Sequence, residues 1–129
     1  MRLLLDTHIW LWLQTTPDRI ADDVLDDLRD PATQLLLSAA SSWEISSKHA
    51  LGTLDLPQHP TSYVPERLRT SRVDALPITV QHTLVAGELP GHHNDPFDRL
   101  LIAQAISEDV VLVTVDRAFD AYEVPLRWA

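Results

Sequence analysis

Five acidic residues stand where an α/β protein could gather them into one pocket. Two of them end short apolar segments that read as strands, and three lie in segments with helical patterns. They are Asp6, Glu44, Asp95, Asp98 and Asp116. In open parallel sheets, ligands collect at the edge where strands end and helices begin. We therefore expect these carboxylates to converge at that edge.

Each acid also has a purely structural interpretation. Asp6, Asp95 and Asp116 all precede helical segments and could act as N-caps, the role in which Asp is most favoured. Pro96 suits the first position of the helix that Asp95 would cap. Glu44 could pair with Lys48, four residues later on the same helix face.

Asp98 is harder to explain as a structural residue alone. Its helix, 95–108, is apolar nearly all round, and the positions stacked on Asp98 are Leu101, Ile102 and Ala105. A carboxylate in such surroundings costs several kcal/mol unless a partner compensates its charge. A capping box with Asp95 is the structural alternative, although Glu or Gln is usual at that position. A bound cation explains the residue better.

Several acids in one pocket repel one another unless cations neutralise them. Oxygen ligands without any thiolate suit Mg²⁺ or Mn²⁺ better than zinc. Divalent ions would also turn an acidic pocket into a site for a phosphodiester. The sequence therefore predicts a Mg²⁺ or Mn²⁺ centre that handles phosphate through metal rather than through a basic surface.

Composition narrows the class of protein further. Ten basic and 19 acidic residues give a formal net charge of −9, which argues against a broad electrostatic grip on nucleic acid or an anionic membrane. The absence of cysteine excludes disulfides and thiol catalysis. No targeting or membrane-spanning segment is visible, so we expect a cytoplasmic protein with no membrane partner. The length of 129 residues predicts one domain over 1–129.

Short apolar segments alternate with helical ones along the whole chain. Strands are expected at 2–5, 35–37, 73–78, 110–115 and 124–127, and helices at 7–13, 18–30, 38–51, 63–71, 80–89, 95–108 and 117–121. Strands that are apolar throughout suit a sheet covered on both faces. This pattern predicts a three-layer α/β/α fold around a central, mainly parallel sheet.

Four stretches of the chain resemble the PIN-domain ribonucleases, specifically the VapC-type toxins of bacterial toxin–antitoxin pairs. They are 3–8 (LLLDTH), 38–45 (SAASSWEI) followed by Lys48 and Gly52, 95–105 (DPFDRLLIAQA), and 112–116 (LVTVD) followed by Phe119 and Tyr122. The order of the stretches and the chain length also match. Thr53 departs from the pattern, because many relatives have a basic residue after the glycine.

The resemblance implies a PIN-like α/β/α domain and a Mg²⁺- or Mn²⁺-dependent endoribonuclease. It implies an acidic quartet of Asp6, Glu44, Asp98 and Asp116 as catalytic metal ligands, with Asp95 as a lower-ranked additional acid. It also implies a homodimer, a cognate antitoxin that blocks the site, and RNA targets such as loops of transfer or ribosomal RNA. Two other classes stay open: a catalytically silent RNA- or protein-binding PIN module, and a Mg²⁺-dependent phospho-acceptor signalling domain.

Some other side chains receive structural interpretations. His8 is expected to be buried or to support the site, and His92 and His93 are assigned to a loop. The tryptophans are expected in the core or in a dimer contact rather than as base-stacking platforms. Arg67, Arg69 and Arg72 form the basic cluster of the sequence, for which a solvated helix face is the favoured interpretation.

Overall fold

The computed structural model describes residues 1–129 and contains one five-stranded sheet in the order β3-β2-β1-β4-β5. Every neighbouring pair of strands runs parallel, which confirms the predicted architecture. The strands are β1 (Arg2–Leu5), β2 (Gln34–Ser38), β3 (Val73–Leu76), β4 (Val111–Thr114) and β5 (Leu126–Trp128). Because β1 lies at the centre of this order, it pairs with a neighbouring strand along both of its edges.

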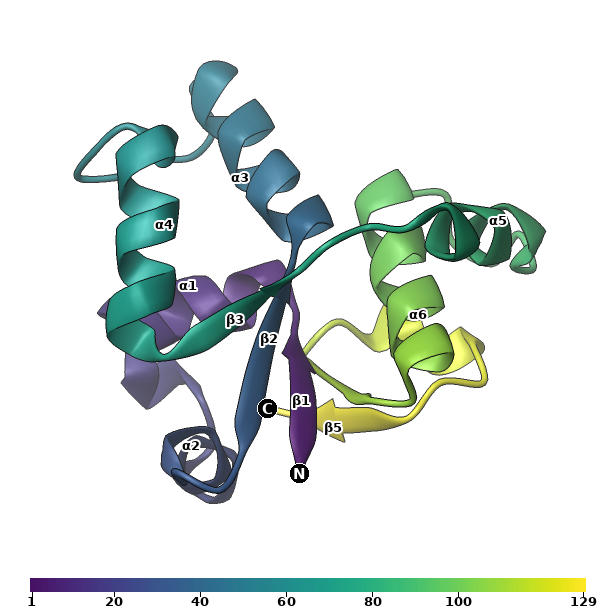
Figure 1. Ribbon diagram of the computed structural model, residues 1–129, viewed down its shortest axis with the longest axis horizontal. Helices are drawn as coiled ribbons and strands as arrows, with labels where there is room; N and C mark the ends of the chain where they lie inside the picture. The colour runs from purple at the N-terminus through teal and green to yellow at the C-terminus, as the bar shows by residue number, and fades with distance from the viewer.

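Helices connect the strands and form the two outer layers (Figure 1). The elements are α1 (Thr7–Thr15), η1 (Pro17–Arg19), α2 (Asp22–Arg29), α3 (Ala39–Ala50), α4 (Pro60–Ser71), α5 (Val80–Glu88), α6 (Pro96–Glu108) and η2 (Arg117–Ala121). No helix is both long enough and apolar enough to cross a membrane.

Successive side chains of a strand point to opposite faces of the sheet, so the core consists of two clusters, one on each face. Leu3 and Leu5 point to the face covered by α1, α2, α3 and α4, where Trp10 is fully buried. Leu4 points to the other face and packs with Ile102 of α6 and Phe119 of η2. The central strands β1, β2 and β4 are therefore mostly apolar because both of their faces are buried. The edge strands differ, since β3 contains the exposed Asp74 and β5 contains the half-buried Arg127.

Two helical segments differ from the sequence-based expectation. Helix α4 begins at Pro60 rather than at residue 63, because Pro60 takes the first position after the His59 N-cap. Pro65 consequently lies inside the helix, beyond its first turn, where a proline is best tolerated. The acidic segment 18–30 divides into η1 and α2, and α2 lies at the opposite end of the sheet from the carboxyl ends of the strands (Figure 1).

The carboxyl ends of β1, β2 and β4 meet at one edge of the sheet. Residue Leu5 is in register with Leu37 of β2 and with Val113 of β4. The residues that follow these positions must therefore lie close together, although more than 100 positions separate the first from the last along the chain. Helix α6 begins near the same edge and brings its first turn to it.

Candidate metal centre

Asp6 is buried at this edge and is held from two sides. Only 5% of the Asp6 surface is exposed to solvent. The Thr7 backbone N–H donates to Oδ1 at 2.7 Å, and the Thr114 hydroxyl donates to Oδ2 at 2.7 Å. Burial raises the pKa of Asp6, and the negative charge of Glu44 raises it further, whereas the Thr114 hydrogen bond opposes the rise. Asp6 is thus both the predicted N-cap of α1 and a buried carboxylate whose ionised form is disfavoured by its surroundings.

Asp98 lies in the first turn of α6 and faces the same region. Burial, followed by the charges of Asp95 and Asp6, raises its pKa to about 7. Its Oδ2 lies 2.6 Å from Nε2 of His93, and this contact opposes the rise. A carboxyl with such a pKa is poorly compensated by the protein itself, as the sequence pattern of α6 predicted.

Glu44 is buried on α3 and forms an ion pair with the lysine one turn later. Its Oε2 lies 2.6 Å from Nζ of Lys48, whose side chain is 42% exposed. The hydrogen bond to Glu44 raises the pKa of Lys48, and the charges of Asp95 and Asp98 raise it too. The predicted i,i+4 pair therefore forms, but on the side of α3 that faces the other acids rather than on a solvated face.

The two remaining acids act as N-caps beside this group. Asp95 accepts hydrogen bonds from the backbone N–H groups of Phe97 and Asp98, at 2.9 and 3.2 Å. Asp116 is exposed and accepts from the Ala118 N–H at 3.0 Å. Both predicted caps are confirmed. Asp98 itself does not close a capping box, since its carboxylate contacts His93 instead.

Thr114 links the centre to its rim. Its buried hydroxyl donates to Asp6 and accepts the backbone N–H of Asp116 at 3.0 Å. Ligand atoms of Asp98, Asp116 and His93 lie within 4.8 Å of one another. The charge of Glu44 raises the pKa of Asp6. The charges of Asp95 and Asp6 in turn raise the pKa of Asp98. The structure thus brings all five predicted acids to one edge.

His93 is a member of this cluster that sequence reasoning assigned to a loop without a role. The Tyr122 hydroxyl accepts the His93 backbone N–H at 2.8 Å and donates to the Pro90 carbonyl at 2.9 Å. Tyr122 is 29 residues away in sequence, so no local pattern predicts the contact. The only available signal was the short spacing between His93 and Asp98.

Arg99 holds the same loop rather than neutralising the acids. Its Nη1 donates to the carbonyls of Pro90 and His93, at 3.1 and 3.2 Å, and its Nη2 to those of Ala86 and Leu89, at 2.7 and 2.9 Å. The guanidinium fork can serve four carbonyls at once because its donors have a fixed planar geometry. The position of His93 therefore depends on Arg99.

Replacing Arg99 by lysine is expected to loosen this loop. One ammonium group cannot reproduce a planar set of donors, so we expect the free energy of unfolding to fall by about 1–3 kcal/mol. Backbone amide exchange over residues 90–94 should become faster in the variant. Arg69→Lys, at an exposed arginine without a side-chain partner, is the matched control, and equal exchange rates in the two variants would contradict the assignment.

Of the two alternatives for His8, burial is wrong: the residue is exposed, because α1 turns Thr7, Ile9 and Trp10 toward the core instead. A supporting role stays a prediction, in line with the lowering of the Asp6 pKa by His8. Trp43 is 56% exposed and lies outside the core, so a dimer contact is the alternative that stays a prediction for it. Its ring packs edge-to-face on Phe97 of α6, with ring centroids 4.7 Å apart.

The donor set fits a hard divalent cation. It consists mainly of carboxylate oxygens. Apart from His93, which contacts Asp98, Lys48 is the one cationic side chain that forms an ion pair with one of these acids, Glu44. The raised pKa values of Asp6 and Asp98 identify a deficit of positive charge that Mg²⁺ or Mn²⁺ would supply. Fold and site together define an α/β protein with a cluster of acidic side chains at the carboxyl edge of a parallel sheet.

Comparison with known proteins assigns this architecture to a family. The PIN domain model matches residues 3–125, and the chain belongs to the PIN domain family. It is 40% identical over 72 residues to Ribonuclease VapC16 of Mycobacterium tuberculosis, a match that covers 53% of this chain and 50% of that protein. The matched segment thus spans about half the length of this curated relative.

Solved structures share the fold across almost the whole chain. VapBC2 from Rickettsia felis, bound to a DNA fragment from its promoter, superposes with a TM-score of 0.73 at 19% identity, covering 99% of this chain and 98% of that one. VapBC-1 from nontypeable Haemophilus influenzae gives a TM-score of 0.67 at 24% identity, covering 98% and 97%. At these identities the likeness establishes the fold.

Proposed function

We propose that this protein is a metal-dependent endoribonuclease toxin of the VapC type. The observation that carries the proposal is the convergence of five carboxylates whose charges the protein itself does not balance, in a chain 40% identical over 72 residues to a ribonuclease of that name. The substrate is RNA, for which loops of transfer or ribosomal RNA are candidates. The proposed domain comprises residues 1–129.

Four carboxylates have proposed catalytic roles as metal ligands. Asp6, Glu44 and Asp98 would hold the principal ion, directly or through water, and Asp116 would complete that site or a second one. Asp95 is a lower-ranked ligand because its Oδ1 already accepts two backbone N–H groups. A bound divalent ion lowers the pKa of water and offsets charge on the phosphate.

Neighbouring residues have supporting roles in the same proposal. Thr114 orients the Asp6 carboxylate through its hydroxyl. His93 holds Oδ2 of Asp98, and such partners fix the orientation of ligands and tune their basicity. Lys48 holds the Glu44 carboxylate and adds one positive charge at the rim, where a phosphate would approach.

Cleavage of RNA by the purified protein tests the proposal. Total cellular RNA is incubated with the protein in Mg²⁺, in Mn²⁺ and in excess EDTA. Discrete fragments that require a divalent ion are the expected result. RNA binding without cleavage under any metal would instead identify a catalytically silent module, and stable phosphorylation of Asp6 by acyl phosphate would identify a phospho-acceptor domain.

The proposed protein partners are a cognate antitoxin and a second copy of this chain. The solved neighbours named above are VapBC assemblies, which supports a toxin–antitoxin pair. Self-association is supported by large apolar side chains that solvent reaches. On α5, Val80 is 75% exposed and Leu84, one turn later, is 61% exposed. On α3, Leu51 follows the last turn and is 77% exposed.

Leu84→Glu is expected to shift the protein from dimer to monomer. The substitution places a charge in an apolar contact, where it would be desolvated without a partner. Light scattering after size-exclusion chromatography should then report half the mass. Thr83→Glu, a control on the adjacent face of α5, should leave the mass unchanged. A monomeric wild-type protein at the highest concentration measured would contradict the proposed homodimer.

A further inference from the structure

A pocket lies at the end of the sheet opposite the acidic edge. It has a volume of about 460 Å³ and lies among α1, α4, the end of α2 and the beginnings of β2 and β3. Most of its lining is polar, and three of the lining residues are Arg29, Arg67 and Arg72. In a chain with a net charge of −9, three arginines around one pocket are a marked concentration of positive charge.

These arginines are distinguished by what their guanidinium groups do not contact. Five of the other arginines each have a hydrogen-bonding, ionic or aromatic partner within the chain: Arg2, Arg19, Arg99, Arg117 and Arg127. Arg29 and Arg72 have none, and Arg67 uses only Nε, which donates to Oε1 of Gln14 at 3.0 Å. Apart from the exposed Arg69, the guanidinium groups whose terminal nitrogens have neither a hydrogen-bond acceptor nor an aromatic ring as partner are therefore those at this pocket.

The pocket's own acids do not neutralise the arginines. Asp30 accepts the Ala32 backbone N–H at 2.9 Å, and Asp74 accepts the Gln34 amide at 3.2 Å. Neither carboxylate lies within ion-pair distance of an arginine. By contrast, Arg127 pairs with the acids of α2 on the other side of that helix.

Helix dipoles give a structural reason for two of the three arginines. Arg29 ends α2 and Arg72 caps the C-terminus of α4, where positive charge is favoured by about 0.3–1 kcal/mol. Arg67 lies a full turn before the end of α4, and the dipole does not explain its position. It also does not explain why all three face one cavity.

We propose that this pocket binds the phosphate group of a small phosphorylated molecule, of nucleotide size. Arginine presents planar, bidentate donors that match phosphate oxygens, and the volume lies within the range of about 300–1,000 Å³ typical of small-molecule sites. The Ser71 and Thr33 side chains add hydroxyls to the lining. The site is separate from the acidic edge and does not depend on the proposed nuclease activity.

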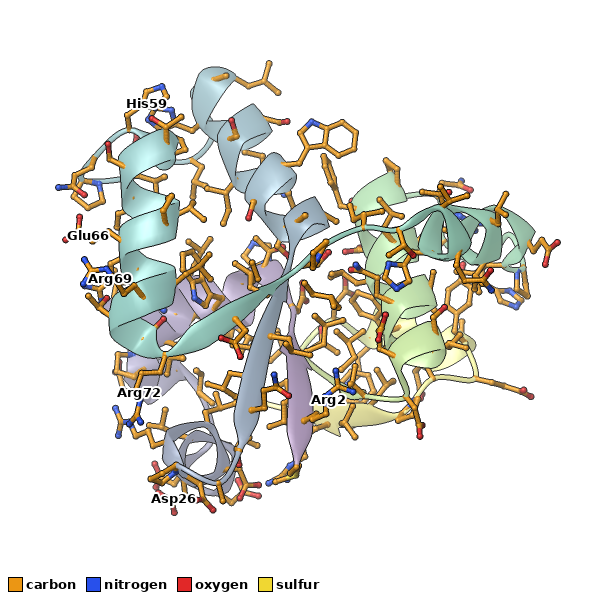
Figure 2. The ribbon with its side chains drawn as sticks, in the orientation of Figure 1. Arg2, Asp26, His59, Glu66, Arg69 and Arg72 are labelled. Carbon is orange, nitrogen blue, oxygen red and sulfur yellow. The ribbon has the colours of Figure 1, made fainter.

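The surroundings favour a small ligand over an RNA strand. Helix α2 carries four acidic residues within 22–29 and borders the pocket, so an extended polyanion would meet repulsion on leaving it. Figure 2 shows Arg72 between the lower end of α4 and α2, with Asp26 on the outer side of α2. A ligand with one phosphate group can stay inside the ring of arginines.

Titration calorimetry with AMP, adenosine and a short single-stranded RNA tests this site. The full-length protein is measured in EDTA and phosphate-free buffer, so that no divalent ion contributes at the acidic edge. The variant is Arg29→Gln combined with Arg72→Gln, two exposed side chains without intramolecular partners. Arg69→Gln is the control: it removes one positive charge from α4, on the side facing away from the sheet (Figure 2).

We expect AMP to bind the wild-type protein and adenosine to bind it at least about 10-fold more weakly. The affinity of the double variant for AMP should also be lower than that of the wild type by about 10-fold. The Arg69→Gln protein should stay within about 2-fold of wild type, as expected for one screened surface charge. Inorganic phosphate should compete with AMP. The proposal is overturned if AMP does not bind at a concentration of about 10 mM, since a weak site has a dissociation constant of about 1 mM. Equal effects of Arg69→Gln and the double variant would overturn it too, as would RNA using these arginines while AMP does not.

Discussion

Replacing Asp6 by asparagine is expected to lower the rate of metal-dependent RNA cleavage by about 1,000-fold, because the central carboxylate of the metal centre loses its charge. The asparagine has the same size as the aspartate, and its Oδ1 can still accept the Thr7 N–H that Asp6 accepts at 2.7 Å. The protein should therefore stay folded while it loses activity. Cleavage of a defined RNA, measured with circular dichroism on the same sample, separates the two effects.

Asp26→Asn serves as the matched control for Asp6→Asn. Asp26 is an exposed acid on α2 (Figure 2), far from the carboxyl edge of the sheet, so its removal changes the net charge equally without touching the centre. This control should cleave at the wild-type rate. A wild-type rate in the Asp6→Asn protein itself would show that the acidic edge is not the site of hydrolysis.

Asp98→Asn is expected to abolish cleavage and, in metal-free buffer, to stabilise the protein. The pKa of Asp98 is raised to about 7 in the folded state, above its ordinary value of 3.8. The folded state therefore holds the proton over a range in which the unfolded chain releases it. As pH rises from about 4 to about 7, the ionised carboxylate becomes an increasing cost to folding.

The stability difference between Asp98→Asn and wild type should follow that pH window. Below about pH 4 the wild-type carboxyl is protonated in both states, and the two proteins should differ little. Above about pH 7 the variant should be more stable by about 2 kcal/mol, a value reduced from the full pKa shift for solvent screening. Urea unfolding in EDTA at pH 5 and pH 8 measures this difference.

Saturating Mg²⁺ or Mn²⁺ supplies the converse test. An ion that binds the folded wild type should stabilise it at pH 8, whereas the Asp98→Asn protein should gain much less. Asp26→Asn should respond as the wild type does. A pH-independent stability difference, or equal stabilisation of all three proteins by metal, would contradict a role for Asp98 as a metal ligand.

Local signals in the sequence were sufficient for most of the fold. The apolar segments predicted strands because both faces of the sheet are buried, and Asp95-Pro96 predicted the start of α6 because cap and first-turn chemistry depend on adjacent residues. The expected start of α4 at residue 63 is three residues too late, because a proline is tolerated best in a first turn and a start at 63 would place Pro65 there. The interior of this helix accommodates the proline while Tyr63 and Val64 pack in the core.

The site was predictable in its acids but not in its supporting contacts. Carboxylates at strand ends converge because parallel strands in register share an edge. The placement of His93 depends on Tyr122 and on the fork of Arg99, whose targets are carbonyls that have no sequence signature. The sequence likewise does not show that Arg29 and Arg72 at the opposite pocket lack intramolecular partners, since paired and unpaired arginines are the same letter in a sequence.

The central place of β1 has a consequence for synthesis of the protein. Strand β1 pairs with β2 along one edge and with β4 along the other, so one edge stays without its partner until residues 111–114 have been made. Thr114, which orients Asp6, arrives in that same late segment. A nascent chain therefore cannot complete the acidic edge before residues 111–114 have been synthesised.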